Sequence, residues 1–109
     1  MKLVIAIVQD EDAGRLIGEL MNEGYGVTKL ATTGGFLKSG NTTLLIGLDD
    51  ERFDECMKVI ERICKSRKQI TSAPVTHGGT TGMYAPYPIE VSVGGATVFV
   101  LSVDQFVKF

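Results

Sequence analysis

The feature that most constrains the fold is a pattern that occurs twice in the chain. The segments IAIVQDED, residues 5–12, and LLIGLDDE, residues 44–51, are both apolar stretches that run directly into acidic residues. Each apolar stretch has the composition of a buried strand, and apolar residues then recur at the spacing of a helix with one buried face. The repeat therefore predicts two strand–helix units.

The other expected elements follow from periodicity and from β-branched residues. Strands are predicted over residues 3–9, 27–33, 42–48, 89–93 and 96–103. The resulting order, β-α-β-β-α-β-β, is the split arrangement of a ferredoxin-like sandwich, in which one antiparallel sheet carries both helices on one face. We therefore expect a single α+β domain over residues 1–109, with an extra C-terminal strand.

The ends and the buried faces of the two helices can also be predicted. Asp10 or Asp12 is expected to cap the first helix, and Asp49 and Asp50 the second, because a short carboxylate accepts the free N–H groups of a first turn. Gly24 is expected to end the first helix in a left-handed conformation. The predicted core-facing side chains are Leu16, Ile17, Leu20 and Met21, and then Phe53, Cys56, Met57, Ile60, Ile63 and Cys64.

The predicted sheet has more apolar surface than its own helices can cover. Its strands are apolar on both sides, and the sequence offers no third helix for the second face. A large exposed apolar surface marks an interaction site in a folded protein. We expect an oligomer in which sheets pack against each other.

Composition excludes several classes of protein. The net charge of -2 and the pI of about 5.3 argue against a general nucleic-acid binder, which needs a basic surface. The longest N-terminal apolar run, residues 3–8, is too short for a membrane span or a signal peptide and is followed by acidic residues. Cys56 and Cys64 are expected to be reduced core residues of a cytoplasmic protein, and the single histidine, His77, argues against a metal site.

Two glycine-containing segments are expected to be loops. Residues 34–41, GGFLKSGN, nearly match the phosphate-binding pattern GxxxxGK[ST], but Asn41 replaces the lysine and a strand follows where that pattern needs a helix. This segment still suits a nucleotide, because its glycines let backbone N–H groups approach a phosphate, Phe36 has a flat ring for a base and Asn41 has an amide for a base edge. A plain hairpin loop has the same composition. Residues 69–87 lack periodicity and are too long for an ordinary connection, and Gly94-Gly95 is expected to be a hairpin turn.

Three blocks of the sequence resemble the PII-like cyclic di-AMP receptor proteins of bacteria. They are IAIVQDED, TKLATTGGFLKSGNTTLLIG and YPIEVSVGGATVFVLSVDQF, and the resemblance runs along nearly the whole chain. It implies a cytoplasmic homotrimer with one cyclic di-AMP in each of three clefts between subunits. It also implies no catalysed reaction and no cofactor, and a downstream protein partner that responds to the loops around residues 34–41 and 69–87.

The resemblance also implies the binding residues. Thr28 and its backbone neighbours Gly26 and Val27 would contact the ligand, Asn41 would hydrogen-bond an adenine edge, and Gly47 would let the ligand approach its strand. The other residues that the resemblance assigns to the site are Gly35, Phe36 and Leu37, which would close over an adenine, and Phe99, which would belong to the pocket wall.

Two positions depart from the family pattern. Related proteins can carry an arginine where this chain has Gly26, and a glutamine where it has Lys108. These departures bear on affinity rather than on the class of ligand. Two alternatives remain open from the residues: a PII-type sensor of ATP, ADP or another metabolite, and a ferredoxin-like enzyme, for which no clustered base, metal ligands or arginine at the phosphates is found.

Overall fold

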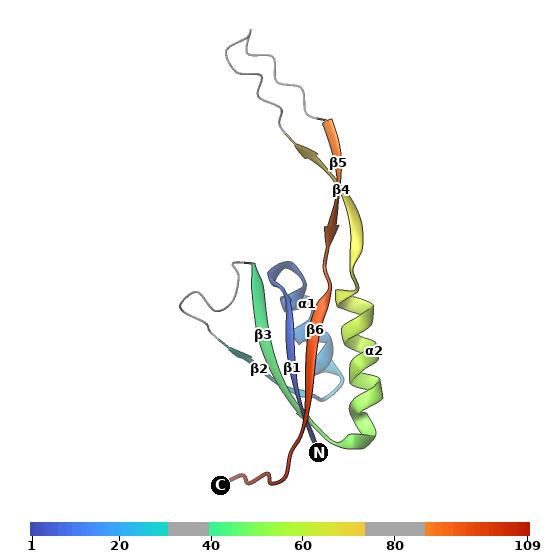
Figure 1. Ribbon diagram of the computed structural model, residues 1–109. Helices are drawn as coiled ribbons and strands as arrows, with labels where there is room; N and C mark the ends of the chain where they lie inside the picture. The colour runs from blue at the N-terminus through green and yellow to red at the C-terminus, as the bar shows by residue number, and fades with distance from the viewer. Residues whose placement is uncertain (31–39, 74–86) are drawn as a thin grey trace.

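The chain is divided between a helix-covered sheet and a hairpin that projects from one end of it (Figure 1). The computed structural model describes residues 1–30, 40–73 and 87–109. Residues 34–39 of the predicted loop 34–41, the glycine loop, and His77 therefore lie outside the described residues. In chain order the elements are β1 (Lys2–Gln9), α1 (Asp10–Asn22), β2 (Gly26–Leu30), β3 (Asn41–Leu48), the 3-10 turn η1 (Asp50–Arg52), α2 (Phe53–Cys64), β4 (Arg67–Ala73), β5 (Tyr87–Val93) and β6 (Ala96–Ser102).

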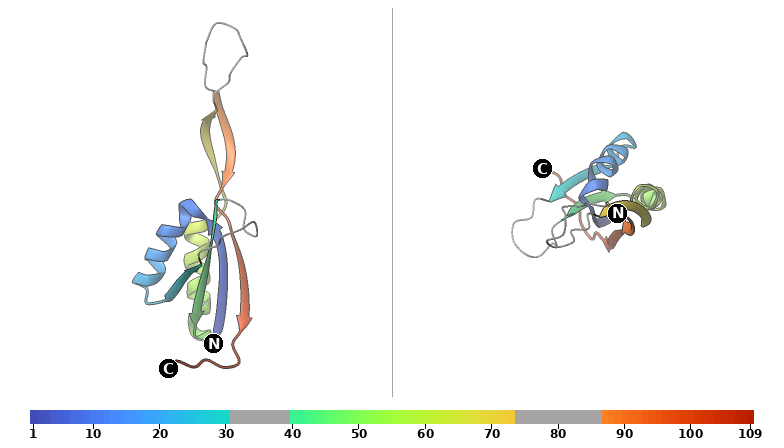
Figure 2. Two further views of the ribbon diagram at one scale, coloured as in Figure 1. Left: turned by 90° about the vertical axis from the view of Figure 1, so that its left-hand side faces the viewer. Right: turned by 90° about the horizontal axis from the view of Figure 1, so that it is seen from above.

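The main sheet has four strands in the order β2-β3-β1-β6, and each neighbouring pair is antiparallel. Both helices lie on the same side of it (Figure 2). This α+β arrangement is consistent with the predicted ferredoxin-like sandwich. The edge position beside β1 is occupied by β6, so the last strand of the chain completes the sheet.

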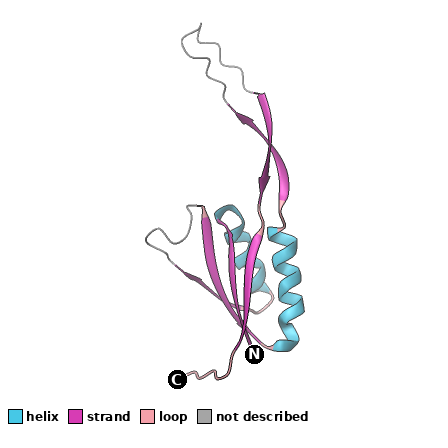
Figure 3. Cartoon of the chain, viewed as in Figure 1, coloured by secondary structure: helices cyan, strands magenta, loops and turns pink. Residues whose placement is uncertain are grey.

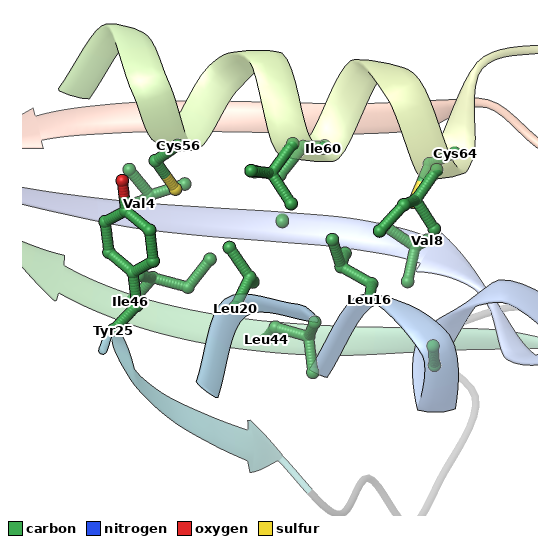
Figure 4. Packing of buried hydrophobic residues seen from close by; sticks show 14 of the residues in the cluster. Val4, Val8, Leu16, Leu20, Tyr25, Leu44, Ile46, Cys56, Ile60 and Cys64 are labelled. Atoms are coloured by element: carbon green, nitrogen blue, oxygen red, sulfur yellow. The ribbon is translucent and has the colours of Figure 1, made fainter. Parts of the chain in front are cut away.

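The core lies between the sheet and the helices, as the alternating pattern of β1 requires. Val4, Ala6 and Val8 are buried, and the residues between them point to the other face. Leu16 of α1 and Ile60 of α2 meet over these strands (Figure 4). Full burial of one such aliphatic side chain stabilises the fold by about 1.5–3 kcal/mol. The other predicted helix positions that are buried are Leu20, Cys56, Ile63 and Cys64, and Ile17, Phe53 and Met57 pack partly against them.

Met21 is the one predicted core position of α1 that is wrong. Its side chain is 62% exposed, whereas Leu20 beside it is fully buried. Successive residues of a helix are rotated by about 100°, so the stripe that contains Ala13, Leu16 and Leu20 leaves Met21 outside it.

The C-terminal end of α1 follows the prediction. Gly24 has φ 87°, its N–H donates to Met21 O at 3.0 Å, and the N–H of Tyr25 donates to Leu20 O at 2.9 Å. These two bonds satisfy helix carbonyls in the pattern of a Schellman motif, which favours glycine at the left-handed position.

The predicted aspartate caps form no side-chain capping bond in the described residues. Gln9, not an aspartate, precedes α1, and Arg52 precedes α2. Asp49 does hold the N-cap position of η1, which leads into α2, but its side chain accepts no capping hydrogen bond there. Asp10 accepts a hydrogen bond from the Thr42 hydroxyl, and Asp12 pairs with Arg67, so both carboxylates are engaged by other elements. Their place in the first turn still favours the helix through its dipole.

The expectation that residues 69–87 lack regular structure is wrong at both ends of that segment. Arg67–Ala73 forms β4, which pairs with β5 in a separate two-stranded sheet (Figure 3). Because β5 pairs with β4 while β6 pairs with β1, Gly94-Gly95 joins two sheets and is not a hairpin turn. Both glycines have positive φ values, 82° and 94°, which allow the chain to change direction there.

Candidate functional site on the uncovered sheet face

The strand register assigns every residue of the main sheet to one of two faces. Ile5 of β1 lies opposite Leu45 of β3 and Phe99 of β6, and Leu45 in turn lies opposite Thr28 of β2. These four residues form one row across the sheet on the face that the helices leave uncovered. Phe99 is 54% exposed. We call this surface the uncovered face; its members are Leu3, Ile5, Ile7, Gln9, Gly26, Thr28, Leu30, Asn41, Thr43, Leu45, Gly47, Thr97, Phe99 and Leu101.

Five of the predicted binding residues lie on this uncovered face. Thr28 and Phe99 are at the two ends of the central row, 71 positions apart in the sequence. Gly26 and Gly47 lie opposite each other in the next row, and Asn41 lies at the other end of β3. The fold thus brings together, on one surface, residues that the sequence spreads over three strands, β2, β3 and β6.

Val27 lies on the other side of the sheet. It pairs with Ile46, and its half-buried side chain packs against the core. Only the backbone of Val27 is therefore available to a ligand on the uncovered face. Lys29 has the same orientation because it is two residues further along β2. Its side chain therefore leaves the strand on the face that carries the helices.

The glycine pair Gly26 and Gly47 leaves the end of the uncovered face without side chains. Among the described residues, a Cβ atom at Gly47 would contact Met1 Cε alone, at 3.4 Å, and one at Gly26 would have no neighbour within 4 Å. A surface cavity of about 210 Å³ includes both glycines, with Tyr25 and Arg52 on its helix side. A planar or bulky ligand group can therefore approach the backbone of β2 and β3 at this end.

The opposite end of the uncovered face has a second cavity, of about 300 Å³. Asn41 of β3 and its paired residue Gln9 of β1 line one side of this cavity. Residues 94–97 line the other side. Carboxamide groups can donate and accept hydrogen bonds at once, as the edge of an adenine base requires. The sequence did not predict Gln9 as a site residue. The alternation along β1 could have indicated it, because Gln9 follows Ile5 and Ile7 at two-residue spacing and so shares their face.

No residue of the uncovered face, within the four strands that form it, carries a charge. Its side chains are aliphatic, aromatic, hydroxyl or carboxamide groups. Such a surface suits a neutral heteroaromatic ring better than a free phosphate. The phosphates of a nucleotide would be bound by backbone N–H groups, or by cationic side chains outside this face. Lys108, in the exposed C-terminal segment after β6, is one cation outside the sheet.

The described residues offer no arrangement for metal or thiol chemistry. No group of three His, Cys, Asp or Glu side chains in residues 1–30, 40–73 and 87–109 could hold a metal ion. Cys56 and Cys64 are free and buried, and burial raises the pKa of each thiol to about 11, so both are protonated at neutral pH. No helix in these same ranges is long and apolar enough to cross a membrane.

The predicted residues Gly35, Phe36 and Leu37 lie in the segment between β2 and β3 that falls outside the described residues. The described ends of that segment are Leu30 and Gly40. Gly40 precedes Asn41 and accepts a hydrogen bond from the N–H of Asp10 at 2.8 Å. Gly40 therefore leads into β3 directly beside the cavity that contains Asn41.

Comparisons with known proteins identify the family of this chain. A family model described as Cyclic-di-AMP receptor matches residues 1–109. Among solved structures, the crystal structure of a functionally unknown protein from Pediococcus pentosaceus is 47% identical. The match covers 99% of this chain and 96% of that chain, with a TM-score of 0.77. Because the family model matches residues 1–109, the chain belongs to the cyclic-di-AMP receptor family.

Proposed function

We propose that this protein is a non-enzymatic signalling receptor that binds cyclic di-AMP at the subunit interfaces of a homotrimer. The observation that carries the proposal is the position of Gly26, Thr28, Asn41, Gly47 and Phe99 on one uncharged, uncovered face of the sheet. The family description supplies the ligand. The geometry supports the way in which such a ligand is held.

The residues suit different parts of a cyclic dinucleotide. The Asn41 carboxamide hydrogen-bonds an adenine edge, and the Thr28 hydroxyl and neighbouring N–H groups contact phosphate or base. Gly47 allows close approach to β3, and Phe99 forms part of the pocket wall. In the glycine loop, Gly35, Phe36 and Leu37 close over one adenine.

A second subunit completes the site. One face of a sheet is too open to enclose a ligand, and it also exposes large apolar groups: Phe99 is 54% and Leu101 46% exposed. Packing these groups against other copies of the chain removes them from water at about 25 cal/mol per Å². Trimer formation therefore covers apolar surface and builds the walls of the cleft in one step.

Ligand binding then orders the glycine loop and alters the segment beyond β4, which changes the surface offered to a downstream protein. The two free, buried thiols fit a reducing compartment, and we place the receptor in the bacterial cytoplasm.

The proposal is tested by isothermal titration calorimetry with cyclic di-AMP, and with cyclic di-GMP, ATP and AMP as controls. Light scattering of the same sample gives the mass of the assembly. We expect tight binding of cyclic di-AMP alone, near one ligand per subunit, to a particle of three chains. Binding of ATP without binding of cyclic di-AMP would instead indicate a general PII-type sensor. Conversion of cyclic di-AMP to product in the presence of magnesium would overturn the non-enzymatic assignment.

A further inference from the structure

Both strands of the β4–β5 hairpin are attached to one short segment, residues 9–12, where β1 ends and α1 begins. Arg67, the first residue of β4, holds the buried carboxylate of Asp12 through Nη2 at 2.9 Å and Nη1 at 3.3 Å. The N–H of Gly94, directly after β5, donates to Oε1 of Gln9 at 2.7 Å. We call residues 9–12 the β1–α1 junction.

The β1–α1 junction is also attached to the start of β3. The N–H of Asp10 donates to Gly40 O at 2.8 Å, and the Thr42 hydroxyl donates to the Asp10 carboxylate. Gln9 is the antiparallel partner of Asn41, with both side chains on the uncovered face. Directly opposed side chains in such a pair have Cβ atoms about 4.5–5.5 Å apart. Gln9 therefore lies between the carboxamide proposed to contact adenine and the base of the hairpin.

The base of the hairpin is tightly packed at Gly94. A Cβ atom there would lie 2.5 Å from Arg67 Nη1 and 2.9 Å from Lys65 O. The Gly94 backbone therefore lies beside the Arg67 guanidinium, so the contact with Gln9 and the contact with Asp12 are adjacent. The N–H of Gly95, which donates to Cys64 O, ties the same turn to the end of α2.

We infer that Gln9 is a positioning residue that couples ligand occupancy at Asn41 to the orientation of the β4–β5 hairpin. This inference rests on the proposed function. A base that fills the cavity beside Asn41 also meets the Gln9 carboxamide, because both line the same wall. A change in the direction of that carboxamide lengthens or shortens its bond with Gly94, and the hairpin follows. By thermodynamic linkage, the hairpin must in return affect ligand affinity by the same factor.

Two substitutions separate this role from simple packing. Gln9→Glu keeps the length of the side chain and an oxygen that accepts from the Gly94 N–H, whereas Gln9→Met keeps the length and removes the acceptor. Lys68→Met serves as the control on the hairpin itself, since it removes an exposed ion pair with Glu90, at 3.0 Å, without touching the junction. Thermal unfolding first verifies that all three variants are folded.

The experiment measures amide hydrogen exchange by NMR in residues 67–70 and 89–94, with and without cyclic di-AMP, together with the ligand affinity. In the parent, in Gln9→Glu and in Lys68→Met, we expect the ligand to change exchange across the hairpin. In Gln9→Met, we expect that response to disappear and the affinity to change by about fivefold or more, the usual lower bound of an allosteric coupling. A full hairpin response in Gln9→Met, or its loss in Gln9→Glu, would overturn the inference.

Failure of this inference differs from failure of the proposed function. If the parent binds cyclic di-AMP but its hairpin exchange does not change, the receptor assignment stands and the coupling is wrong. If the parent shows no binding, the proposed function is wrong. The ligand-free comparison then still tests the contact, because Gln9→Met should speed exchange at Gly94 relative to Gln9→Glu, and equal rates would contradict the role of Gln9.

Discussion

Arg67, the first residue of β4, forms a bidentate salt bridge with Asp12 in the first turn of α1, with nitrogen–oxygen distances of 2.9 and 3.3 Å. Asp12 is only 6% exposed, although it is charged. The same carboxylate raises the pKa of the Arg67 guanidinium. This contact connects the projecting hairpin with the helix-covered sheet.

Replacement of Arg67 by methionine is expected to destabilise the fold, because it leaves a buried carboxylate without its partner. Arg67→Lys should recover only part of the loss, since an ammonium group cannot reproduce the two parallel bonds of a guanidinium. Urea unfolding gives the order of stability. Lys68→Met, which removes an exposed pair on the same strand, is the control and should stay close to the parent. Equal losses for Arg67→Met and Lys68→Met would contradict a structural role for the Asp12 contact.

Gly94→Ala is expected to destabilise the protein by about 1–2 kcal/mol from the left-handed backbone alone. The φ of Gly94 is 82°, and the added Cβ would also overlap Arg67 Nη1 and Lys65 O. The loss of unfolding free energy should therefore reach or exceed the upper end of that range. Gly18→Ala is the matched control: Gly18 is exposed inside α1, and no atom of the described part of the chain lies within 4 Å of the new Cβ. That substitution should stabilise the fold by about 0.5–1 kcal/mol. A neutral Gly94→Ala would show that the turn relaxes freely.

Tyr25 is expected to make folding sensitive to strongly alkaline pH. Burial raises the pKa of its hydroxyl from 10.0 to about 12, with a further contribution from Glu55. Because the folded state holds the proton more tightly, the stabilising contribution is complete below pH 10 and is lost as the pH rises towards 12. Ultraviolet titration of the native protein should show one phenol that ionises last, and Tyr25→Phe should remove that phase. An unchanged titration in Tyr25→Phe would disprove the assignment.

Asn41→Ala is expected to weaken cyclic di-AMP binding by about 0.5–1.5 kcal/mol, the net contribution of a hydrogen bond. Asn41 is only half-buried at the start of β3, so the melting temperature should change little. Asn22→Ala, at the exposed end of α1, is the control and should leave the affinity unchanged. Calorimetry of the three proteins makes the comparison. Parent-like affinity in Asn41→Ala would remove Asn41 from the site.

Phe36→Ala tests the other adenine contact that the resemblance implies. Stacking of a base on an aromatic ring contributes about 1–3 kcal/mol, so the affinity should fall by that amount if the ring covers an adenine. The same calorimetric titration measures it, and an effect near zero would mean that Phe36 does not stack on the ligand.

Much of the fold could be predicted because its strongest signals are local. The apolar run of β1, the helical spacing of Leu16 and Leu20, and the glycine after α1 each reflect interactions within a few residues or one buried face. β4 was missed for the same reason. Its sequence, RKQITSA, has one large apolar residue, and its pairing comes from main-chain bonds with a strand that begins 14 positions after its end.

The sequence by itself determined the strand–helix repeat, the alternation that separates core residues from the uncovered face, and, through its resemblance, the family of the chain. Only the tertiary structure decided the rest. It placed Thr28 and Phe99 in one row, Gln9 beside Asn41, and Gly94 between two sheets instead of in a hairpin turn. The physical reason is that backbone pairing between strands distant in the sequence determines which residues come into contact. In the first turn of α1, Asp10 therefore contacts Thr42 of β3, and Asp12 contacts Arg67 of β4.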